Sequence, residues 1–418
     1  MEVKKDVGTV AAGSAGMENL GLSKGEVSED QRGNVVIEPY FYYHSVDASE
    51  GKYGSCSDGS GYDSMKQFLL SVVDDPVVHS TRKARLGNHH SSGLYDNSSS
   101  DWEHVAKDDE CMMLEAQLQV RFYENSCSMA EFIVKQEVSK AFFKDRGVAA
   151  GLVRMHFHDC FVRGCDGSVL IDSTPSNKAE KDSPANNPSL RGFEVIDSAK
   201  ARLESVCPGV VSCADTIAFA ARDSIEITRG FGYNVPAGRR DGRISLASET
   251  RSLPSPAFNL DQLTQNFKSM GLTQEEMVTL SGAHTIGRSH CGSFSNRLYN
   301  FSSTRRQDPS LDPAYAAQLK QQCPQGSTDA SLVVPMNPAS PAITDVGYYT
   351  DVLDNRGLFT SDQTLLTNPT TAIQVTQNSR NPFLWKSKFA LAMVKMGQIG
   401  VLTGAAGEIR ANCRVINS

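Results

Sequence analysis

From about residue 128 to the end of the chain, apolar residues recur every three or four positions, the period of amphipathic helices. Val134, Val138 and Phe142 mark one such helix, and Ser128 with Glu131 predicts a capping box at its start. Further helices are predicted over residues 148–161, 193–204, 213–227, 260–270, 275–281, 313–321, 342–354 and 387–402. Alternating runs typical of strands are nearly absent, so the sequence predicts a mainly α fold.

Local signals predict where some of these helices begin and what separates them. Thr273 and Glu276 form a second capping-box pattern at the start of the helix that contains Glu275. The proline-rich stretches 253–256 and 334–341 are predicted to be loops between helices.

Residues 1–114 differ from the rest of the chain. They are rich in Ser, Gly, Asp and Asn, and hold 19 acidic and 10 basic side chains, a net charge of -9. Residues 115–418 hold the remaining 29 acidic and 31 basic side chains, a net charge of +2. We therefore predict a mostly disordered leader of unknown role, with one short helical pattern over residues 65–73, followed by a folded domain over residues 115–418.

The overall composition excludes several classes of protein. With 39% hydrophobic and 21% charged residues, the chain is typical of a soluble globular protein, and its net charge of -7 argues against a nucleic-acid binder. The longest apolar stretch, residues 389–402, contains Lys395 and Gln398 and is shorter than the roughly 18 residues of a membrane span. No apolar core follows Met1, so no cleavable secretory signal is predicted there.

Eight of the ten cysteines lie in the second part of the chain, and their even number favours disulfides. The doubled Cys-x-x-Cys pattern of a zinc site is absent from the sequence. Eight thiols allow 105 pairings, among which spacing does not choose. Disulfides imply an oxidising compartment, which conflicts with the missing signal at Met1.

The densest cluster of candidate chemistry lies in the helix predicted over residues 148–161. Arg154 and His158 are four residues apart and share one helical face, whereas His156 points almost opposite and is interpreted as structural. A cation beside an imidazole suits a reaction in which the imidazole takes a proton and the cation stabilises an anion. The alternative is an exposed arginine beside a core histidine. A zinc site of His156, His158 and Asp159 is disfavoured because these side chains diverge around the helix.

Two further features are candidates for ion binding. His284, at the end of an apolar helix, could present one ring nitrogen to a metal while the other donates to a carboxylate, although a core histidine is the alternative. Asp159, Asp166 and Ser168 lie along a tight glycine-containing loop, and hard oxygen donors of this kind suit calcium. A solvated acidic turn is the alternative, and the short Cys160 to Cys165 separation favours the ion site.

Over about residues 117–418 the chain resembles the class III family, the secreted haem peroxidases of plants. The motifs that carry the resemblance occur in order along the chain: residues 154–168 (RMHFHDCFVRGCDGS), 180–182 (EKD), 191–193 (RGF), 211–215 (VSCAD), 238–241 (GRRD), 280–285 (LSGAHT), 361–363 (SDQ) and 409–413 (IRANC). The resemblance implies a helical fold of two domains with one haem b between them.

The resemblance also implies roles for individual residues. His284 is the expected axial ligand of the haem iron, with Asp362 accepting its second ring proton. His158, Arg154 and Asn186 are the expected catalytic residues on the opposite side of the haem. Two others complete the expected site, and these are Phe157 over the haem edge and Pro254 where donors bind.

The implied activity is the reduction of hydrogen peroxide to water with oxidation of phenolic donors by successive one-electron steps. It belongs to hydrogen peroxide catabolism, the response to oxidative stress, and phenolic or lignin metabolism. The expected protein is a monomeric glycoprotein without membrane or nucleic-acid partners, secreted to the apoplast or cell wall, with the vacuole as the alternative. Asn97 and Asn300 lie in Asn-x-Ser sequons that only export would make relevant.

The family binds two calcium ions. The distal set maps to Asp159, Val162, Gly164, Asp166 and Ser168, with Glu180 reaching the ion through water, and the proximal set to Thr285, Asn337, Ser340, Ile343 and Asp345. Asn337 stands where the family generally has Asp, and Ser340 where Thr is common, so weaker proximal binding is expected. The implied disulfides are Cys127–Cys207, Cys160–Cys165, Cys213–Cys413 and Cys291–Cys323, which leave Cys56 and Cys111 outside the scheme.

The amino terminus departs from the family pattern, because Lys107 to Glu110 replace the apolar end of the expected signal. Either residues 1–114 are a fused or mispredicted leader, or this form is not exported, and we favour the first. Two other functions compete with the peroxidase. A catalytically idle haem-binding scaffold would keep the haem but lack phenol oxidation, and a zinc hydrolase built on His156 and His158 would contain zinc without haem.

Overall fold

The computed structural model describes residues 27–29, 35–37 and 118–418, and the chain divides into two units, residues 1–95 and 96–418. In the first unit, β1 (Val27–Glu29) pairs antiparallel with β2 (Val35–Ile37), and Val27 lies opposite Ile37. The rest of the predicted leader, its helix at residues 65–73 and the boundary at residue 114 lie outside the described residues, so those predictions remain predictions.

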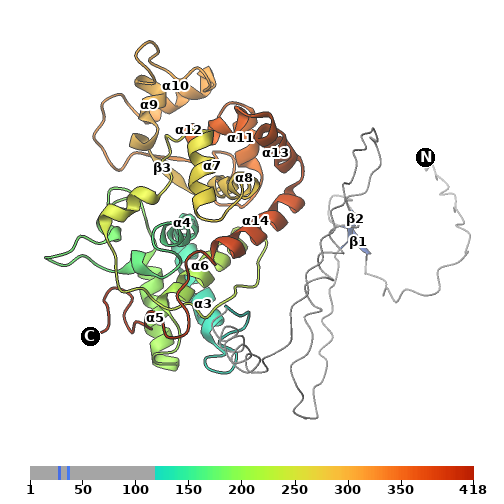
Figure 1. Cartoon of the computed structure of the whole chain (residues 1–418). Helices are drawn as coiled ribbons and strands as arrows, with labels where there is room; N and C mark the ends of the chain where they lie inside the picture. Colours follow the sequence, from blue (N-terminus) through green and yellow to red (C-terminus); the bar gives the residue numbers. More distant parts are fainter. Residues whose placement is uncertain (1–26, 30–34, 38–117) are drawn as a thin grey trace, which may run out of the picture. The chain divides into compact units, whose positions relative to one another are not determined.

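Four helices of the second unit pack around one hydrophobic cluster. They are α3 (Ala130–Lys144), α4 (Val148–Cys160), α5 (Phe193–Val206) and α6 (Cys213–Ile227), which Figure 1 shows in teal to light green. Ile133, Leu152, Ile196 and Phe219 are among the buried side chains of this cluster. The apolar spacing along each helix places one stripe against the cluster, as amphipathic periodicity predicts.

A second cluster lies among helices from the later part of the chain. These are α7 (Leu260–Ser269), α8 (Gln274–Ser281), α11 (Gly347–Leu353), α12 (Thr360–Gln363), α13 (Pro369–Arg380) and α14 (Pro382–Met396). Its core contains Phe267, Tyr349 and Trp385, all buried. The polar ends of the two largest rings are satisfied inside this core, since Tyr349 Oη donates to Val278 O and Trp385 Nε1 to Thr279 O.

Helix α4 belongs to both clusters, because Leu152 and Met155 pack in the first and Val153 in the second. It therefore lies at the boundary between them (Figure 1). The prediction of a mainly α fold with two packed halves is confirmed, whereas the predicted place of a haem between them stays an expectation.

A smaller third cluster lies around α9 (Ser295–Tyr299) and α10 (Pro313–Gln322). It contains the two-stranded antiparallel sheet of β3 (Arg288–His290) and β4 (Val333–Pro335). Among the helices of residues 118–418, none combines the length with the apolar character that a bilayer span requires.

The four disulfides that the resemblance implies are all present, namely Cys127–Cys207, Cys160–Cys165, Cys213–Cys413 and Cys291–Cys323. The first ties the turn before α3 to the end of α5. The third ties the start of α6 to the carboxyl-terminal segment, 200 residues away in sequence. A disulfide that closes a loop of this length lowers the conformational entropy of the unfolded chain. Folding then costs less entropy, so the folded state is stabilised.

Helix ends show where the sequence predictions were right and wrong. The Thr273–Glu276 capping box is confirmed. The Ser128–Glu131 capping box is wrong: α3 starts after Met129 without a side-chain cap, because Cys127 O accepts the Ala130 N–H and Glu131 binds Arg222 instead. The predicted proline-rich loop over residues 334–341 holds part of β4.

Two other helices have different bounds from those predicted, for local reasons. Helix α14 begins and ends earlier than residues 387–402, because Pro382 suits its first turn and the guanidinium of buried Arg239 binds Gly397 O at its end. Helix α11 begins only at Gly347, because the preceding residues form a loop in which Asp345 accepts the Gly347 N–H.

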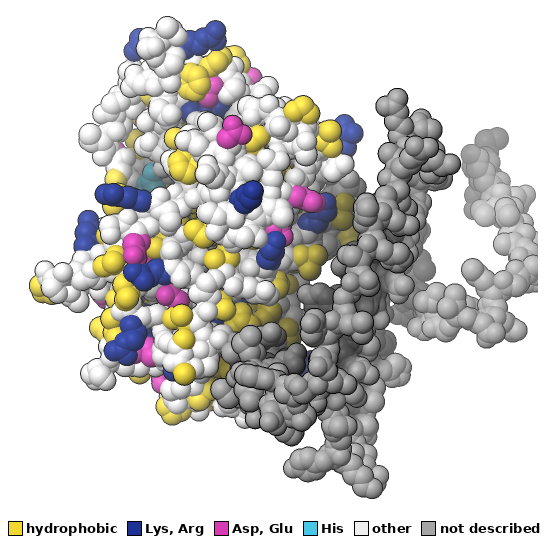
Figure 2. Space-filling model, viewed as in Figure 1, with side chains coloured by type: hydrophobic (Ala, Val, Ile, Leu, Met, Phe, Trp, Pro, Cys, Tyr) yellow, Lys and Arg dark blue, Asp and Glu magenta, His cyan; other side chains and the backbone are white. Residues whose placement is uncertain are grey.

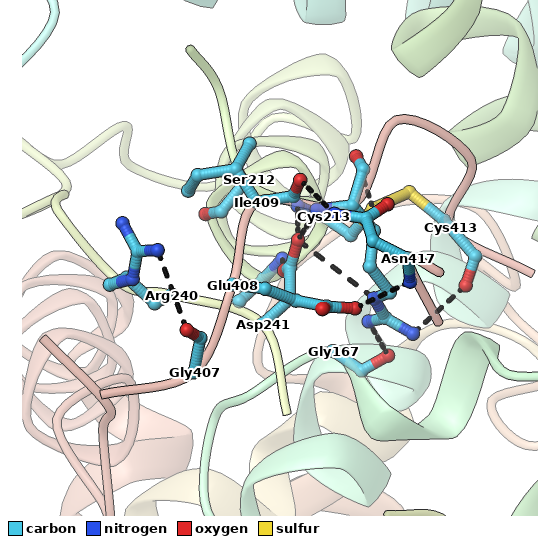
Figure 3. Close-up of polar contacts among 12 residues, drawn as sticks. Gly167, Ser212, Cys213, Arg240, Asp241, Gly407, Glu408, Ile409, Cys413 and Asn417 are labelled. Atoms are coloured by element: carbon cyan, nitrogen blue, oxygen red, sulfur yellow. Dashed lines mark hydrogen bonds and ion pairs between the residues drawn. A yellow bond between two sulfur atoms is a disulfide. The ribbon is translucent and has the colours of Figure 1, made fainter. Parts of the chain in front are cut away.

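The carboxyl-terminal segment is anchored by a buried ion pair. Asp241, fully buried, accepts the N–H groups of Cys213 and Ala214 at the start of α6, and also that of Arg410 (Figure 3). The Arg410 guanidinium, also fully buried, donates to Cys413 O and to Gly167 O. Gly167 has a φ of 68°, and a Cβ there would lie 2.8 Å from Arg410, so both space and backbone conformation require glycine.

Replacing Arg410 with methionine tests this anchor. Arg410→Met leaves Asp241 buried without its positive partner, which costs about 3–5 kcal/mol. We expect a clear fall in the urea midpoint of the disulfide-intact protein. The matched variant Lys135→Met removes the exposed pair with Glu226 and should cost less than about 1 kcal/mol. Equal shifts for the two variants would contradict the role assigned to the buried pair.

Candidate active site

Arg154 and His158 lie one turn apart on α4, as their spacing predicts. Arg154 Nε donates to His158 Nε2 over 3.1 Å. His158 is buried and Arg154 is partly buried. Phe157 lies between Arg154 and His158 in sequence, and its ring centroid is 4.5 Å from that of Phe161. This aromatic contact holds the end of the helix next to Arg154 and His158.

Asn186 determines which nitrogen of His158 carries the proton. Its Oδ1 lies 2.6 Å from His158 Nδ1, and its Nδ2 donates to Glu180 O over 2.8 Å. Because the amide nitrogen is engaged by a carbonyl, the amide oxygen faces the ring and accepts from a protonated Nδ1. His158 Nε2 is therefore left with a lone pair, in keeping with the bond that it accepts from Arg154.

Burial and the Arg154 charge hold the pKa of His158 well below its ordinary value, against the opposing effect of the Asn186 hydrogen bond. The imidazole is thus neutral at neutral pH and can accept a proton. Burial and the charge of Arg191 lower the pKa of Arg154 to about 10, so its guanidinium remains a cation under the same conditions. The site therefore combines a neutral base with a fixed positive charge.

Two groups that the sequence did not predict orient Arg154. Its guanidinium donates to Ser189 Oγ and to Ala185 O, each over 2.9 Å. Both belong to the same loop as Asn186, so one segment orients the histidine and the arginine together. A serine and a main-chain carbonyl without helical spacing to Arg154 give no sequence signal of this kind.

His284 lies directly after α8 and pairs with a carboxylate from another helix. Its Nδ1 is 2.7 Å from Oδ1 of Asp362 in α12. Asp362 is buried, and it also accepts from Tyr348 Oη and from the N–H of Phe359. These contacts fix the carboxylate and, through it, the orientation of the His284 ring.

The other nitrogen of His284 is available to a ligand. No residue in the described part of the chain forms a hydrogen bond with its Nε2, and the side chain is 39% exposed although its partner Asp362 is 2% exposed. A histidine held at Nδ1 by a carboxylate, with Nε2 free, is a donor suited to haem iron. The residues here fit such a group.

The loop that contains Pro254 lies beside the Asp362 helix. The N–H of Ser361 donates to Pro256 O over 3.0 Å, and Leu253 is buried in the second cluster while Pro254 is only partly buried. This hydrogen bond connects the loop of the sequence-predicted donor-binding residue to the helix that carries Asp362.

Three buried carboxylates come together from the end of α4, the loop that follows it and the 3-10 turn that begins at Glu180. Asp159, Asp166 and Glu180 are all buried. Burial raises the pKa of each, that of Glu180 to about 8, with Asp166 as the next cause for both Asp159 and Glu180. Ser168 Oγ and both carboxylate oxygens of Glu180 are buried without a hydrogen-bond partner. Unpartnered oxygens among buried carboxylates fit a bound cation, and an all-oxygen donor set suits calcium.

The loop backbone is held close to the carboxyl-terminal part of the chain. Gly164 has a φ of 97°, and a Cβ there would lie 2.4 Å from Gly400 O, so only glycine fits. The Cys160–Cys165 disulfide closes the loop, and Arg163 between the two cysteines binds both carboxylate oxygens of Glu249. Val162 and Gly164 are therefore fixed beside Asp159 and Asp166.

The sequence-predicted proximal calcium residues also come together, but they bind one another. Thr285 Oγ1 and Ser340 Oγ both donate to Asp345, over 2.7 and 2.5 Å. The side chain of Asn337 is fully buried among these three. Ile343 joins the loop through its N–H, which donates to Ser340 O.

His156 does not join His158. Its Nδ1 lies 3.7 Å from Cys160 Sγ, and among the described residues it converges only with Cys160 and Cys165. Those two sulfurs form a disulfide with each other, so they offer no thiolate to zinc. The arrangement agrees with the structural interpretation of His156 and gives the zinc alternative no support.

His156 predicts a pH effect on stability. Burial and the charge of Arg239 lower its pKa to about 3. A depressed folded-state pKa favours folding above the unfolded pKa of about 6.5, and that contribution is lost as the pH falls toward 3. Between about pH 7 and pH 5, the natural protein should therefore lose about 1–2 kcal/mol more of its free energy of unfolding than His156→Gln does. Urea unfolding of both proteins at each pH measures it, and an unchanged pH slope in the variant would contradict the assignment.

Charge on the described residues of the face drawn in Figure 2 shows no concentration of basic side chains. Figure 2 shows basic and acidic side chains interspersed over the described part of the face it draws, without a large patch of either sign. This distribution agrees with the small net charge of residues 115–418.

Comparisons with known proteins identify similar chains. A family model described as peroxidase matches residues 134–381. Peroxidase 5 of Vitis vinifera is 80% identical over 306 residues, which are 73% of this chain and 93% of that protein. Peroxidase 1 of Zea mays is 52% identical over 316 residues (73% and 86%), and Peroxidase 3 of Arabidopsis thaliana is 51% identical over 310 residues (73% and 94%).

Proposed function

This chain belongs to the peroxidase family, as a class III plant haem peroxidase that acts on hydrogen peroxide, and we propose that His158, Arg154 and Asn186 are its catalytic residues. The observation that carries the proposal is the hydrogen-bond series Asn186–His158–Arg154, which leaves a neutral base and a cation side by side. Phenols are the proposed donors, oxidised one electron at a time, because a one-electron donor needs access only to an exposed edge of the site.

His158 acts on the proton of the incoming peroxide. With Nδ1 protonated and held by Asn186, Nε2 is the unprotonated nitrogen. It exchanges the hydrogen bond from Arg154 for the proton of the peroxide and later returns that proton to the oxygen that leaves as water. The lowered pKa of His158 keeps Nε2 unprotonated before peroxide arrives. Asn186 is a positioning residue, because it acts through the ring of His158.

Arg154 stabilises the negative charge that develops on the departing oxygen. Its guanidinium is fixed in advance by Ser189 and Ala185, so little reorganisation is needed during the reaction. A preorganised donor of this kind contributes about 3–4 kcal/mol to transition-state stabilisation.

The proposed axial ligand is His284 through Nε2, with Asp362 at Nδ1 making the imidazole more electron-rich. When bound, one haem b supplies the iron at which the peroxide O–O bond is cleaved. Phe157 is proposed to lie over its edge, and Pro254 to line the place where phenolic donors approach.

The family implies calcium, and the distal loop is the proposed calcium site. Its ligands are Asp159, Val162, Gly164, Asp166 and Ser168, with Glu180 through water. Asp159 directly follows His158, and Glu180 O binds Asn186, so an ion there would fix both neighbours of the base. The unpartnered Glu180 oxygens support this assignment.

The proposed location is outside the cell, in the apoplast or cell wall, because four disulfides require an oxidising compartment. Asn300 of the second sequon is exposed, as a glycosylation acceptor must be, whereas Asn97 lies outside the described residues. We propose a monomer, since every residue assigned to the site comes from this chain.

Substitution of the distal pair tests the catalytic assignment. His158→Ala should slow the reaction with peroxide by about 100- to 10,000-fold and Arg154→Leu by about 100- to 1,000-fold, because each removes a group used in the transition state. Stopped-flow rates with peroxide measure this. His290→Ala, at a half-exposed histidine on β3, is the control. A Soret band with unchanged rates in both distal variants would contradict the catalytic assignment of His158 and Arg154.

Asp362→Asn tests the proximal assignment. The variant keeps an acceptor for His284 Nδ1 but removes the charge, so the imidazole becomes a weaker donor to iron. We expect a higher ferric/ferrous reduction potential, measured by spectroelectrochemistry, and an activity about 10- to 100-fold lower. An unchanged potential would show that Asp362 does not act through the axial ligand.

A further inference from the structure

The side-chain amide of Asn337 occupies the centre of the proximal oxygen cluster. Its Nδ2 lies 3.2 Å from Thr285 Oγ1, 2.9 Å from Ser340 Oγ and 3.2 Å from Asp345 Oδ1. Asn337 is fully buried, so no water competes for these contacts. An NH₂ group carries the positive end of the amide dipole, and here it faces three oxygens that converge as ligands converge on a cation.

The orientation of the amide is fixed by the backbone. Asn337 Oδ1 accepts the N–H of Ala339 over 3.1 Å. To bind a cation, the amide would have to turn its oxygen toward the cluster, which would set Nδ2 against the Ala339 N–H, donor against donor. That turn would lose the hydrogen bond from Ala339 and the contacts of Nδ2 with the three oxygens, so the orientation with nitrogen toward the cluster is favoured.

The hydroxyl groups of the cluster are satisfied as well. Thr285 and Ser340 donate their protons to Asp345 and use lone pairs to accept from Asn337. Asp345 additionally accepts the Gly347 N–H. Among the buried side-chain atoms without a partner in the described chain, none belongs to this cluster.

The distal loop is the internal comparison. It holds three buried carboxylates and leaves Ser168 Oγ and both Glu180 oxygens unpartnered. The proximal cluster holds one carboxylate, that of Asp345, and leaves no such oxygen in the described structure. The distal loop thus presents unpartnered oxygens that suit a cation, whereas the oxygens of the proximal cluster already accept from the Asn337 amide.

We propose that the Asn337 amide replaces the second calcium ion, so that this peroxidase binds a single calcium per chain, at the distal loop. The inference deepens the calcium part of the proposed function. Thr285 directly follows His284, and the amide therefore ties the segment of the axial ligand to the loop of Ser340 and Asp345 without an ion. Chelators should then loosen only the distal side of the site.

Calcium counting tests the proposal on the full-length holoprotein. The protein is equilibrated with calcium and freed of loosely bound ions on a chelating resin. Calcium and iron are then measured by mass spectrometry, and protein by amino-acid analysis. We expect one calcium per chain for the natural sequence and two for Asn337→Asp, because the added carboxylate removes the donor and supplies a ligand. Two ions in the natural protein, or no gain in a folded Asn337→Asp variant, would overturn the proposal.

Two controls keep the result interpretable. Ser340→Thr restores the other residue common in the family but keeps the amide, so its count should equal that of the natural protein, and a gain of one ion would contradict the role of Asn337. If Asn337→Asp does not fold, the count for the natural protein decides alone. The calcium content is expressed as a molar ratio to protein as well as to iron. A failure of haem binding or of peroxidase activity would therefore not change the calcium-to-protein ratio.

Discussion

The hydrogen bond between Asn186 and His158 is the contact on which the active site depends. It places the proton on Nδ1 and leaves Nε2 as the acceptor, in agreement with the hydrogen bond that Arg154 donates to Nε2. Burial alone would make His158 neutral but would not direct its lone pair. The Glu180 carbonyl completes the arrangement by fixing the amide of Asn186 in turn.

This dependence explains why the ion loop and the base are built from adjacent residues. His158 is followed by Asp159, and Glu180 accepts from Asn186 through its carbonyl while both oxygens of its buried carboxylate remain without a partner among the described residues. A cation that neutralises the buried carboxylates therefore stabilises the same two segments that orient the base. The carboxyl terminus supports this region too, since Arg410 binds Gly167 O within the loop. Binding of the proposed ion and positioning of the proposed catalytic histidine would thus be mechanically linked.

The proximal side reaches a similar rigidity by other means. Asp362 is held by Tyr348 and by the N–H of Phe359, so its carboxylate cannot turn away from His284. The Asn337 amide closes the neighbouring cluster with hydrogen bonds alone. Neutral donors satisfy oxygens without the desolvation cost of a charge, which makes an amide a workable substitute for an ion where only one carboxylate is present.

The sequence by itself determined the mainly α class, most helices of residues 118–418 and the pairing of Arg154 with His158, because these depend on helical period and short-range spacing. It did not show α13, whose buried face includes the polar residues Thr371, Gln374 and Asn378, so no apolar stripe marks it. Only the tertiary structure decided three other features. These are the hydrogen bonds of Arg154 to Ser189 and Ala185, the absence of a Ser128 cap and the direction of the Asn337 amide. Each of these depends on a hydrogen-bond partner brought close by folding, and periodicity carries no information about such partners.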